Sequence, residues 1–301
     1  MKTITDSLFS YSTDFSWLVK IRRWWGETPS SLRFPTWFRV KGGSTESRPT
    51  SFNRVRIALC VFLLSALTLP AGEPQPSISK PGKLLLSEEF SGAAMPAKWQ
   101  PGGRAKSFSI VDGALQGVCA PDDSHGPAIC VPVEGRDLTI QFSVKFAKPG
   151  LVLFLVDGES KFGGTAHLLR VALGNKFAAL QQDRGCLESK KEQAAEKAKA
   201  AKDGRKPAPP TKEQIADPKF YRTEMLDRKV ADVTDGQWHS VLVEICGNDA
   251  VAQVDGVVLR ATGSVFDAKK ARIYFLIGMS GTMLIDNVKV WENTPRKAEK
   301  Q

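Results

Sequence analysis

The chain has 301 residues, with 42 Lys or Arg against 32 Asp or Glu and a formal net charge of +10. The positive excess is local, because residues 1–71 carry 10 basic and 4 acidic side chains, and residues 187–229 carry 12 and 8. The remainder is balanced, so the composition argues against the basic face that nucleic-acid binding requires. The 230 residues after position 71 suffice for one large domain with its own core.

An apolar run with the form of an export signal lies well inside the chain. Arg54 and Arg56 precede the run from Ile57 to Leu69, and small residues follow it at Ala71. The run is shorter than the ~20 residues of a membrane-spanning helix, so residues 54–71 are predicted to be a cleaved signal peptide with no stable span left afterwards. Residues 1–53 are interpreted as an extended N-terminus or as sequence upstream of the true start. We expect an exported protein, in the periplasm, at the cell surface or secreted.

Short strands are predicted after a linker over residues 72–82, which is rich in Pro, Gly and Ser. Asp112-Gly113 between two apolar runs is a strong hairpin signal. Residues 137–146 alternate apolar and polar side chains, which predicts a half-buried antiparallel strand. Residues 151–157 are apolar on both faces, which predicts a covered central strand.

The pattern changes over residues 187–229, which are charged, prone to helix and interrupted by prolines. We interpret them as a helical insertion on the surface, with a protein partner as one use for it. Strand patterns resume and continue to residue 292, before a polar tail over 293–301. A domain over 83–292 with many strands and no regularly interleaved helices predicts an all-β sandwich or jelly roll.

Four cysteines follow the signal, and an exported protein can oxidise them. Three connectivities are possible. The neighbouring residues Cys119 and Cys130 form a plausible pair, which would leave Cys186 and Cys246 to join the two ends of the insertion region. Buried free thiols are the alternative. Zinc is not expected, because no two cysteines have the C-x-x-C spacing.

Three stretches carry a family resemblance: LLLSEEFSG, QWHSVLVEICGNDAVAQVDGVVL and MLIDNVKVWE. They resemble the concanavalin A-like lectin/glucanase superfamily, and more narrowly the secreted 3-keto-disaccharide hydrolase-like, laminin-G-like domains of planctomycete-type bacteria. The resemblance implies a jelly-roll β-sandwich whose concave face binds carbohydrate. The chain lacks the E-x-D-x-x-E strand of the glucanases, so their mechanism with two carboxylates is not predicted here.

Two histidines are candidates for chemistry. His125 lies in the loop sequence PDDSHGPA, where a nearby carboxylate could join it in metal binding or proton transfer; an ordinary polar turn is the alternative. His167 and Arg170 are three residues apart on a predicted strand. They should therefore face opposite sides unless a bulge intervenes.

The resemblance adds two carboxylates to this site, Asp157 before His167 and Asp183 after it. It implies that Arg170 and Asp183 bind sugar hydroxyls and that Asp157 accompanies His167 in catalysis, although ion pairs at a sheet edge are the simpler alternative. It also implies a structural calcium ion between the first and last strands, with Glu89 and Asp286 as ligands.

Three functions remain open. The first is an exported β-sandwich that recognises or processes a glycan. The second is a hydrolase of disaccharides (including keto-disaccharides) or glycosides, with His125 or His167 as the base and a carboxylate that orients it. The third is a non-catalytic envelope scaffold in which the insertion binds a protein partner.

Overall fold

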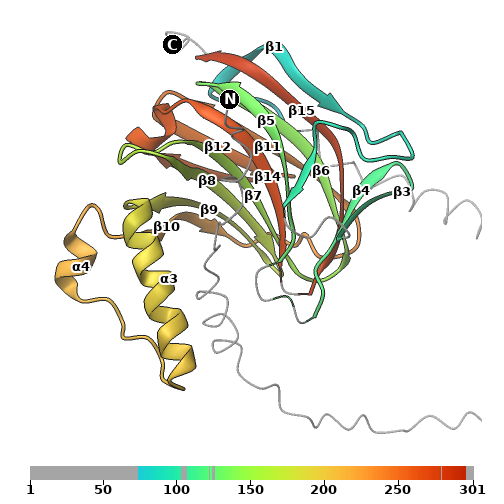
Figure 1. Cartoon of the computed structure of the whole chain (residues 1–301). Coiled ribbons are helices and arrows are strands. Elements are labelled where there is room, and N and C mark those ends of the chain that lie inside the picture. Colours follow the sequence, from blue (N-terminus) through green and yellow to red (C-terminus); the bar gives the residue numbers. More distant parts are fainter. Residues whose placement is uncertain (1–73, 103–106, 122, 124–125, 279, 296–301) are drawn as a thin grey trace, which may run out of the picture. The chain divides into compact units, whose positions relative to one another are not determined.

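The computed structural model describes residues 74–102, 107–121, 123, 126–278 and 280–295. In this part of the chain, two antiparallel sheets pack face to face (Figure 1). The chain crosses repeatedly between the sheets, as it does from β5 to β6 and from β6 to β7. The predicted all-β jelly-roll sandwich is confirmed.

The eight-stranded sheet has the order β13-β12-β11-β6-β15-β4-β3, with β1 paired to β15. Its strands are β1 (Ser79–Glu88), β3 (Phe108–Val111), β4 (Ala114–Val118), β6 (Leu138–Lys148), β11 (Trp238–Cys246), β12 (Asp249–Val254), β13 (Val257–Thr262) and β15 (Thr282–Pro295).

The seven-stranded sheet has the order β10-β9-β8-β7-β14-β5-β2. Its strands are β2 (Gln100–Gly102), β5 (Ala128–Gly135), β7 (Leu151–Glu159), β8 (Thr165–Gly174), β9 (Phe177–Arg184), β10 (Arg222–Lys229) and β14 (Lys270–Gly278). The helices are α3 (Leu187–Lys202), α4 (Lys212–Ala216) and the short 3-10 turn η2 (Ser264–Asp267).

The core lies between the two sheets and follows the predicted alternation. Every second residue of β6, from Leu138 to Phe146, belongs to the buried core. The ring of Phe142 on β6 contacts the rings of Phe154 and Phe275 of the opposite sheet, and those two rings contact each other. The ring centroids are 4.9 to 5.3 Å apart. β7 lies in the middle of its sheet and is buried on both faces, as its apolar sequence predicts.

The predicted hairpin at Asp112-Gly113 joins β3 to β4. Both residues have positive φ, 52° and 75°. These values fit a type I′ turn, whose twist matches that of the flanking strands.

The ends of the domain differ from the prediction. β1 begins at Ser79, within the predicted linker, and β15 continues to Pro295, within the predicted polar tail. Both strands are longer than predicted because they pair with each other. Ser79 lies opposite Pro295, and each segment supplies hydrogen-bonding partners to the other. Local composition does not reveal a pairing between residues so far apart in sequence.

The insertion is helical only in part. α3 and α4 form as predicted, but the last residues, Arg222 to Lys229, form strand β10 on the edge of the seven-stranded sheet. β10 pairs with β9, so that Glu224 lies opposite Gln182. The prediction of helix here was wrong because a polar helix has little apolar surface to pack, whereas the sheet edge offers β10 both packing and a ladder of hydrogen bonds to β9.

The predicted disulfides are also wrong, since none of the four cysteines forms a disulfide. Cys119 follows β4 and packs into the core, whereas Cys130 lies on β5 in the other sheet, between the core residues Ile129 and Val131. Cys186 caps helix α3, and its sulfur accepts a hydrogen bond from Ser189 N at 3.5 Å. Cys246 ends β11 in the eight-stranded sheet. Cys130 alternates with core residues and therefore faces away from the core that contains Cys119, and Cys186 belongs to the insertion, whereas Cys246 belongs to a sheet.

No helix in the described part of the chain is long and apolar enough to cross a membrane. The predicted signal peptide at residues 54–71 lies outside the described residues.

A buried carboxylate holds the start of the domain in place. Glu244 on β11 is fully buried and accepts hydrogen bonds at 2.8 to 3.0 Å from backbone N–H groups and hydroxyls of the segment Ser77 to Ser79. A carboxylate that accepts several such bonds is a strong anchor, because hydrogen bonds to charged groups exceed neutral ones in strength.

We therefore expect Glu244→Gln to lower the free energy of unfolding by about 1.5–3 kcal/mol, since an amide offers one acceptor oxygen and turns a donor toward other donors. Urea denaturation measures this. Glu134→Gln is the control, because Glu134 pairs with Lys269 at an exposed site and should change stability by less than about 1 kcal/mol. Equal effects of the two substitutions would contradict the anchor.

His239 on β11 joins two loops. Its Nδ1 lies 2.7 Å from Asp255 Oδ2 and its Nε2 lies 2.9 Å from Asp235 Oδ1. Burial opposes the charged imidazole, but the hydrogen bonds and charges of Asp255 and Asp235 outweigh it and raise the pKa of His239 above 6.5.

A raised pKa in the folded state stabilises the protein below pH 6.5, and this contribution disappears as the pH rises through the folded-state pKa. The difference in unfolding free energy between the wild type and His239→Asn should therefore shrink as the pH rises above neutrality. Urea titrations at a series of pH values measure it, and a difference that grows with pH would contradict this role for His239.

Candidate functional site

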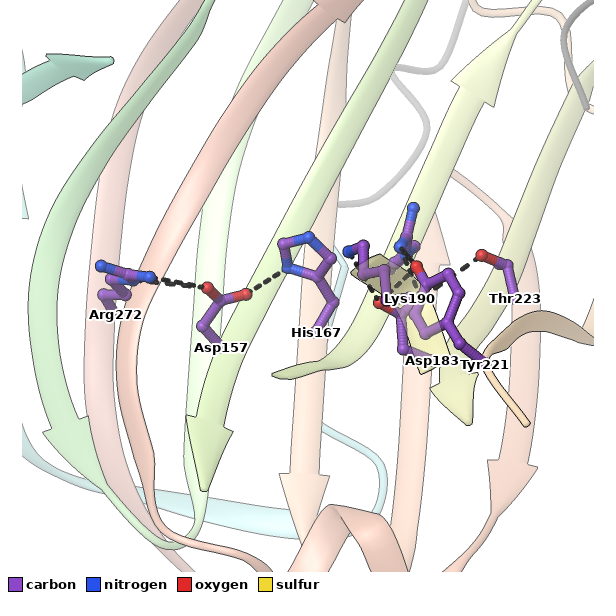
Figure 2. A network of polar contacts seen from close by, with 8 residues as sticks. Asp157, His167, Asp183, Lys190, Tyr221, Thr223 and Arg272 are labelled. Carbon is purple, nitrogen blue, oxygen red and sulfur yellow. Dashed lines mark hydrogen bonds and ion pairs between the residues drawn. The ribbon is translucent and has the colours of Figure 1, made fainter. Parts of the chain in front are cut away.

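A row of polar side chains crosses the outer face of the seven-stranded sheet (Figure 2). The core residues of the central strands of this sheet are apolar, and the charged side chains of the row lie on the opposite face, which turns away from the core. The row consists of Arg272 (β14), Asp157 (β7), His167 and Arg170 (β8), Asp183 (β9) and Thr223 (β10), with Tyr221 just before β10 and Lys190 from α3.

A bulge in β8 brings His167 and Arg170 to the same face. Val156 pairs with Leu169, but Asp157 pairs with His167, so Leu168 is an extra residue on β8. A bulge of this kind changes the face on which the following residues lie. The bulge that His167 and Arg170 need in order to face the same side is therefore present.

The first part of the row is a histidine bonded to a buried carboxylate. His167 Nδ1 lies 2.5 Å from Asp157 Oδ1, and the other oxygen of Asp157 accepts two hydrogen bonds of 3.3 Å from Arg272. Because a carboxylate accepts hydrogen bonds, this contact selects, for the neutral imidazole, the form with its proton on Nδ1 and with Nε2 as an acceptor. The side chain of His167 is 13% exposed, which leaves the ring within reach of a ligand.

The second part is a buried ion pair between Arg170 and Asp183. One guanidinium nitrogen of Arg170 donates to Asp183 Oδ1 at 2.5 Å and to Tyr221 Oη at 3.2 Å. Tyr221 in turn donates its hydroxyl proton to Asp183 Oδ2 at 2.9 Å, and Thr223 donates to Oδ1 at 3.3 Å. The carboxylate of Asp183 thus accepts hydrogen bonds from β8, from β10 and from the residue two positions before Thr223.

Electrostatics keep this group in one protonation state. Burial works against a charged Asp183, but Arg170, His167 and Lys190 outweigh it and hold the pKa of Asp183 below its ordinary value. Burial and the neighbouring charge of Asp183 raise the pKa of Tyr221, so its hydroxyl remains a donor.

Helix α3 of the insertion docks onto this row. Ser189 Oγ accepts a hydrogen bond from Tyr221 N at 3.0 Å, and Gln193 Nε2 donates to Tyr221 O at 2.9 Å. The ammonium group of Lys190 lies 4.6 Å from the centre of the Tyr221 ring and 3.8 Å from Asp183 Oδ2. The insertion therefore forms part of the site.

A cavity of about 620 Å³ lies beside the row and reaches Asp183. Phe162, Ile215 and Phe220 contribute its apolar walls, and Gln182 and Glu224 contribute polar groups. Gln182 Nε2 donates to Glu224 Oε2 at 2.6 Å. Alternation along β9 places Gln182 on the opposite face of the strand from Gln181 and Asp183.

Of the other predicted site residues, His125 is outside the described residues, and Glu89 and Asp286 do not belong to this row. Asp123 Oδ1 accepts a hydrogen bond of 2.9 Å from Gly126 N. Glu89 lies near enough to Asp286 to add to the effect of burial, which raises the pKa of Asp286.

The expected calcium site is not supported by a larger ligand cluster. No group of three or more His, Cys, Asp or Glu side chains that could hold a metal occurs among the described residues. Calcium takes about 6–8 oxygen ligands, and the carboxylates of Glu89 and Asp286 alone supply too few. The calcium ion remains a prediction from the resemblance.

Sequence reasoning found Asp157, His167, Arg170 and Asp183 but missed their partners. Arg272 lies on β14 and Tyr221 at the end of the insertion, both far from β8 in sequence. Tyr221 lies in the segment that the sequence predicts to be a helical insertion. These residues become neighbours only through the order in which the strands pair, and no local sequence pattern indicates that order.

No protein-family model matches the chain, and no curated protein matches it. Solved structures do. They include a non-specific endo-β-1,3(4)-glucanase of family GH16, with 12% identity over 74% of this chain and 98% of that chain and a TM-score of 0.46. LamAcat from Zobellia galactanivorans matches with 10% identity over 69% and 97%, with a TM-score of 0.48. The endo-β-1,3-glucanase from Pyrococcus furiosus matches with 13% identity over 74% and 100%, with a TM-score of 0.43. With TM-scores below 0.5, these likenesses do not bear on what this chain binds or does.

Loss of one member of the buried pair should be costly. We expect Asp183→Asn or Arg170→Met to lower the free energy of unfolding by about 3–5 kcal/mol, because each leaves a buried charge without its partner. The double variant Arg170→Met/Asp183→Asn should lose less than the sum of the single losses. A double-mutant cycle in urea measures the coupling, and additive losses would contradict it.

Proposed function

We propose that the protein binds a sugar on the outer face of the seven-stranded sheet and processes it with His167 as the general base. The observation that carries the proposal is the chain of contacts from Arg272 through Asp157 to His167 Nδ1, which leaves Nε2 as the accepting nitrogen. A positioned histidine of this kind is a common general base.

In the proposed hydrolysis, His167 Nε2 takes a proton from a water molecule whose oxygen forms a bond to the anomeric carbon while the glycosidic C–O bond breaks. The imidazolium then returns this proton to the departing sugar oxygen, which leaves as a hydroxyl. Asp157 holds the ring in orientation through Nδ1 and stabilises the imidazolium that forms, by the logic of an acid–histidine pair. Arg272 keeps Asp157 in position. Arg170 and Asp183 lie beside the histidine on the same face and supply groups that bind sugar hydroxyls.

The contacts of Asp157 favour this mechanism over that of a glycosidase with two carboxylates. By alternation, the outward residues of β7 include Leu153, Leu155, Asp157 and, at the exposed end of the strand, Glu159. Asp157 already contacts His167 and Arg272 with its two oxygens, so it is placed to orient the histidine rather than to attack a sugar. The finer substrate, a disaccharide or 3-keto-disaccharide, is part of the proposal and comes from the sequence resemblance.

Export is also part of the proposal and rests on the apolar run at 57–69. Sequencing of the N-terminus of the protein recovered from the producing cells tests it. A first residue close to Ala71 supports export with cleavage, whereas an intact Met1 contradicts it.

The proposal predicts separate effects on binding and on turnover. A panel of disaccharides, 3-keto-disaccharides and oligosaccharides is first tested for binding by calorimetry and for cleavage by product analysis. For a substrate that is cleaved, His167→Asn should lower kcat by about 10²–10⁴-fold, the usual contribution of a general base, while sugar affinity changes little.

His239→Asn is the matched control, because it makes the same substitution at a histidine in the other sheet. It should leave kcat unchanged under conditions where the variant is folded. If the wild type binds sugars without cleaving any, the protein is a binding module and the catalytic part of the proposal is wrong. If it binds none, the scaffold hypothesis replaces it.

A further inference from the structure

The cavity of about 620 Å³ at the end of the seven-stranded sheet is open to a ligand. Its walls come from the β7–β8 loop, the ends of β9 and β10, the segment around α4 and the start of η2. His167 does not line it. Several lining side chains are exposed, among them Ile215, which is 45% exposed, so a molecule from solvent can reach the walls. The volume lies within the range of about 300–1,000 Å³ that is usual for small-molecule sites.

The insertion is held against the sheet where it forms the cavity wall. Arg222 Nη1 donates to Ile215 O at 2.6 Å, which ties the end of α4 to β10. Gly185 has a φ of 90°, and a Cβ added there would lie 2.4 Å from the backbone of Phe220. The wall is therefore formed before a ligand enters, which lowers the cost of binding.

Part of the cavity wall is apolar. Phe162 of the β7–β8 loop contributes to it, as do Ile215 and Phe220 of the insertion. None of these three side chains is buried. Accessible apolar side chains gathered at a cavity provide contact area for a ligand that has an apolar face.

An oriented carboxylate lies in the same cavity. Glu224 Oε2 accepts a hydrogen bond from Gln182 Nε2 at 2.6 Å and lies 2.9 Å from Arg184 Nε. These contacts fix the carboxylate, while the side chain of Glu224 remains 30% exposed. Glu224 can therefore accept hydrogen bonds from the hydroxyl groups of a ligand.

The cavity lining carries no net charge. It contains four acidic and three basic side chains, and the charge of one of the acids, Asp183, is cancelled by Arg170. Sites for phosphates or carboxylates concentrate positive charge, and sites for cations concentrate negative charge. A neutral ligand with an apolar face and several hydroxyl groups fits this lining best, and a pyranose sugar has that chemistry.

We propose that this cavity is a second sugar-binding site, separate from the face that carries His167. A pyranose ring packs its C–H face against the apolar wall and donates hydroxyl protons to Glu224. The site goes beyond the proposed catalysis and does not depend on it, because His167 does not line the cavity. It also gives the insertion a role in ligand binding.

Two methyl groups can report on the two sites separately. Ile215 lines the cavity, whereas Met225 contacts Gln181, which lies opposite Arg170 in the strand register. Full-length protein with ¹³C-labelled isoleucine and methionine methyl groups is titrated with laminaribiose, cellobiose and glucose 6-phosphate. The substitutions Ile215→Val and Met225→Leu assign the two NMR signals.

Ala216→Trp tests the site by filling it, because Ala216 lines the cavity from α4. Ala195→Trp is the matched control, since Ala195 is an exposed residue of α3 that does not line the cavity. His167→Asn tests whether the two sites are independent.

We expect at least one of the two disaccharides to shift the Ile215 signal until the shift saturates. The affinity measured at this signal should fall about tenfold or more in Ala216→Trp and stay unchanged in Ala195→Trp and His167→Asn. Glu224→Leu should also weaken binding about tenfold or more, because it removes the acceptor. Glucose 6-phosphate should bind no more tightly than the disaccharide.

A shift of the Met225 signal alone would overturn the second site and leave sugar binding at the outer face intact. A shift of the Ile215 signal alone would support the second site and contradict the proposed function. Equal affinities for the wild type and Ala216→Trp, or lost binding in His167→Asn, would overturn the inference, because the sugar would then act on Ile215 from elsewhere. Tighter binding of glucose 6-phosphate would overturn the assignment of a neutral ligand. No shift of either signal with any probe would overturn both proposals.

Discussion

The buried ion pair between Arg170 and Asp183 is the contact on which both the site and the insertion depend. Removing two charges from water costs several kcal/mol per ion, so such a pair is tolerated only when further hydrogen bonds complete it. Tyr221 and Thr223 supply those bonds from the segment that leads into β10. The same tyrosine holds helix α3 through its backbone. The contacts of Tyr221 therefore both fix Arg170 in position and attach the insertion to the sheet.

Local patterns predicted the parts of the fold that local chemistry determines. The alternation over residues 137–146 specified the buried face of β6, and Asp112-Gly113 specified a turn because both residues tolerate positive φ. The bulge at Leu168 was not predictable, since nothing in AHLLRVAL marks an extra residue. Its position follows from the pairing of β8 with β7. That pairing decides that His167 and Arg170 share a face.

The dependence on strand pairing also explains the other differences between the sequence prediction and the structure. The partners Arg272 and Tyr221 come from strand β14 and from the approach to β10, and only the order of the sheet places them beside β7 and β9. The cysteine spacings were suitable for disulfides, but the spacing along a chain does not say which layer each side chain enters. The four site residues that were predicted owed their selection to the family resemblance and to their charges in otherwise apolar strands.

β10 has a consequence for how copies of this protein behave toward one another. It is the terminal strand of the seven-stranded sheet, and it covers the backbone of β9 from Ala178 to Arg184. An uncovered strand of that kind is a template for strand addition between molecules. β10 is a poorer template, because its register shifts between Met225 and Asp227 and it ends in Arg228 and Lys229. We therefore expect the insertion that completes the polar row also to guard this edge of the sheet, because a shortened insertion that lost β10 would expose the backbone of β9 along its apolar half, Phe177 to Leu180.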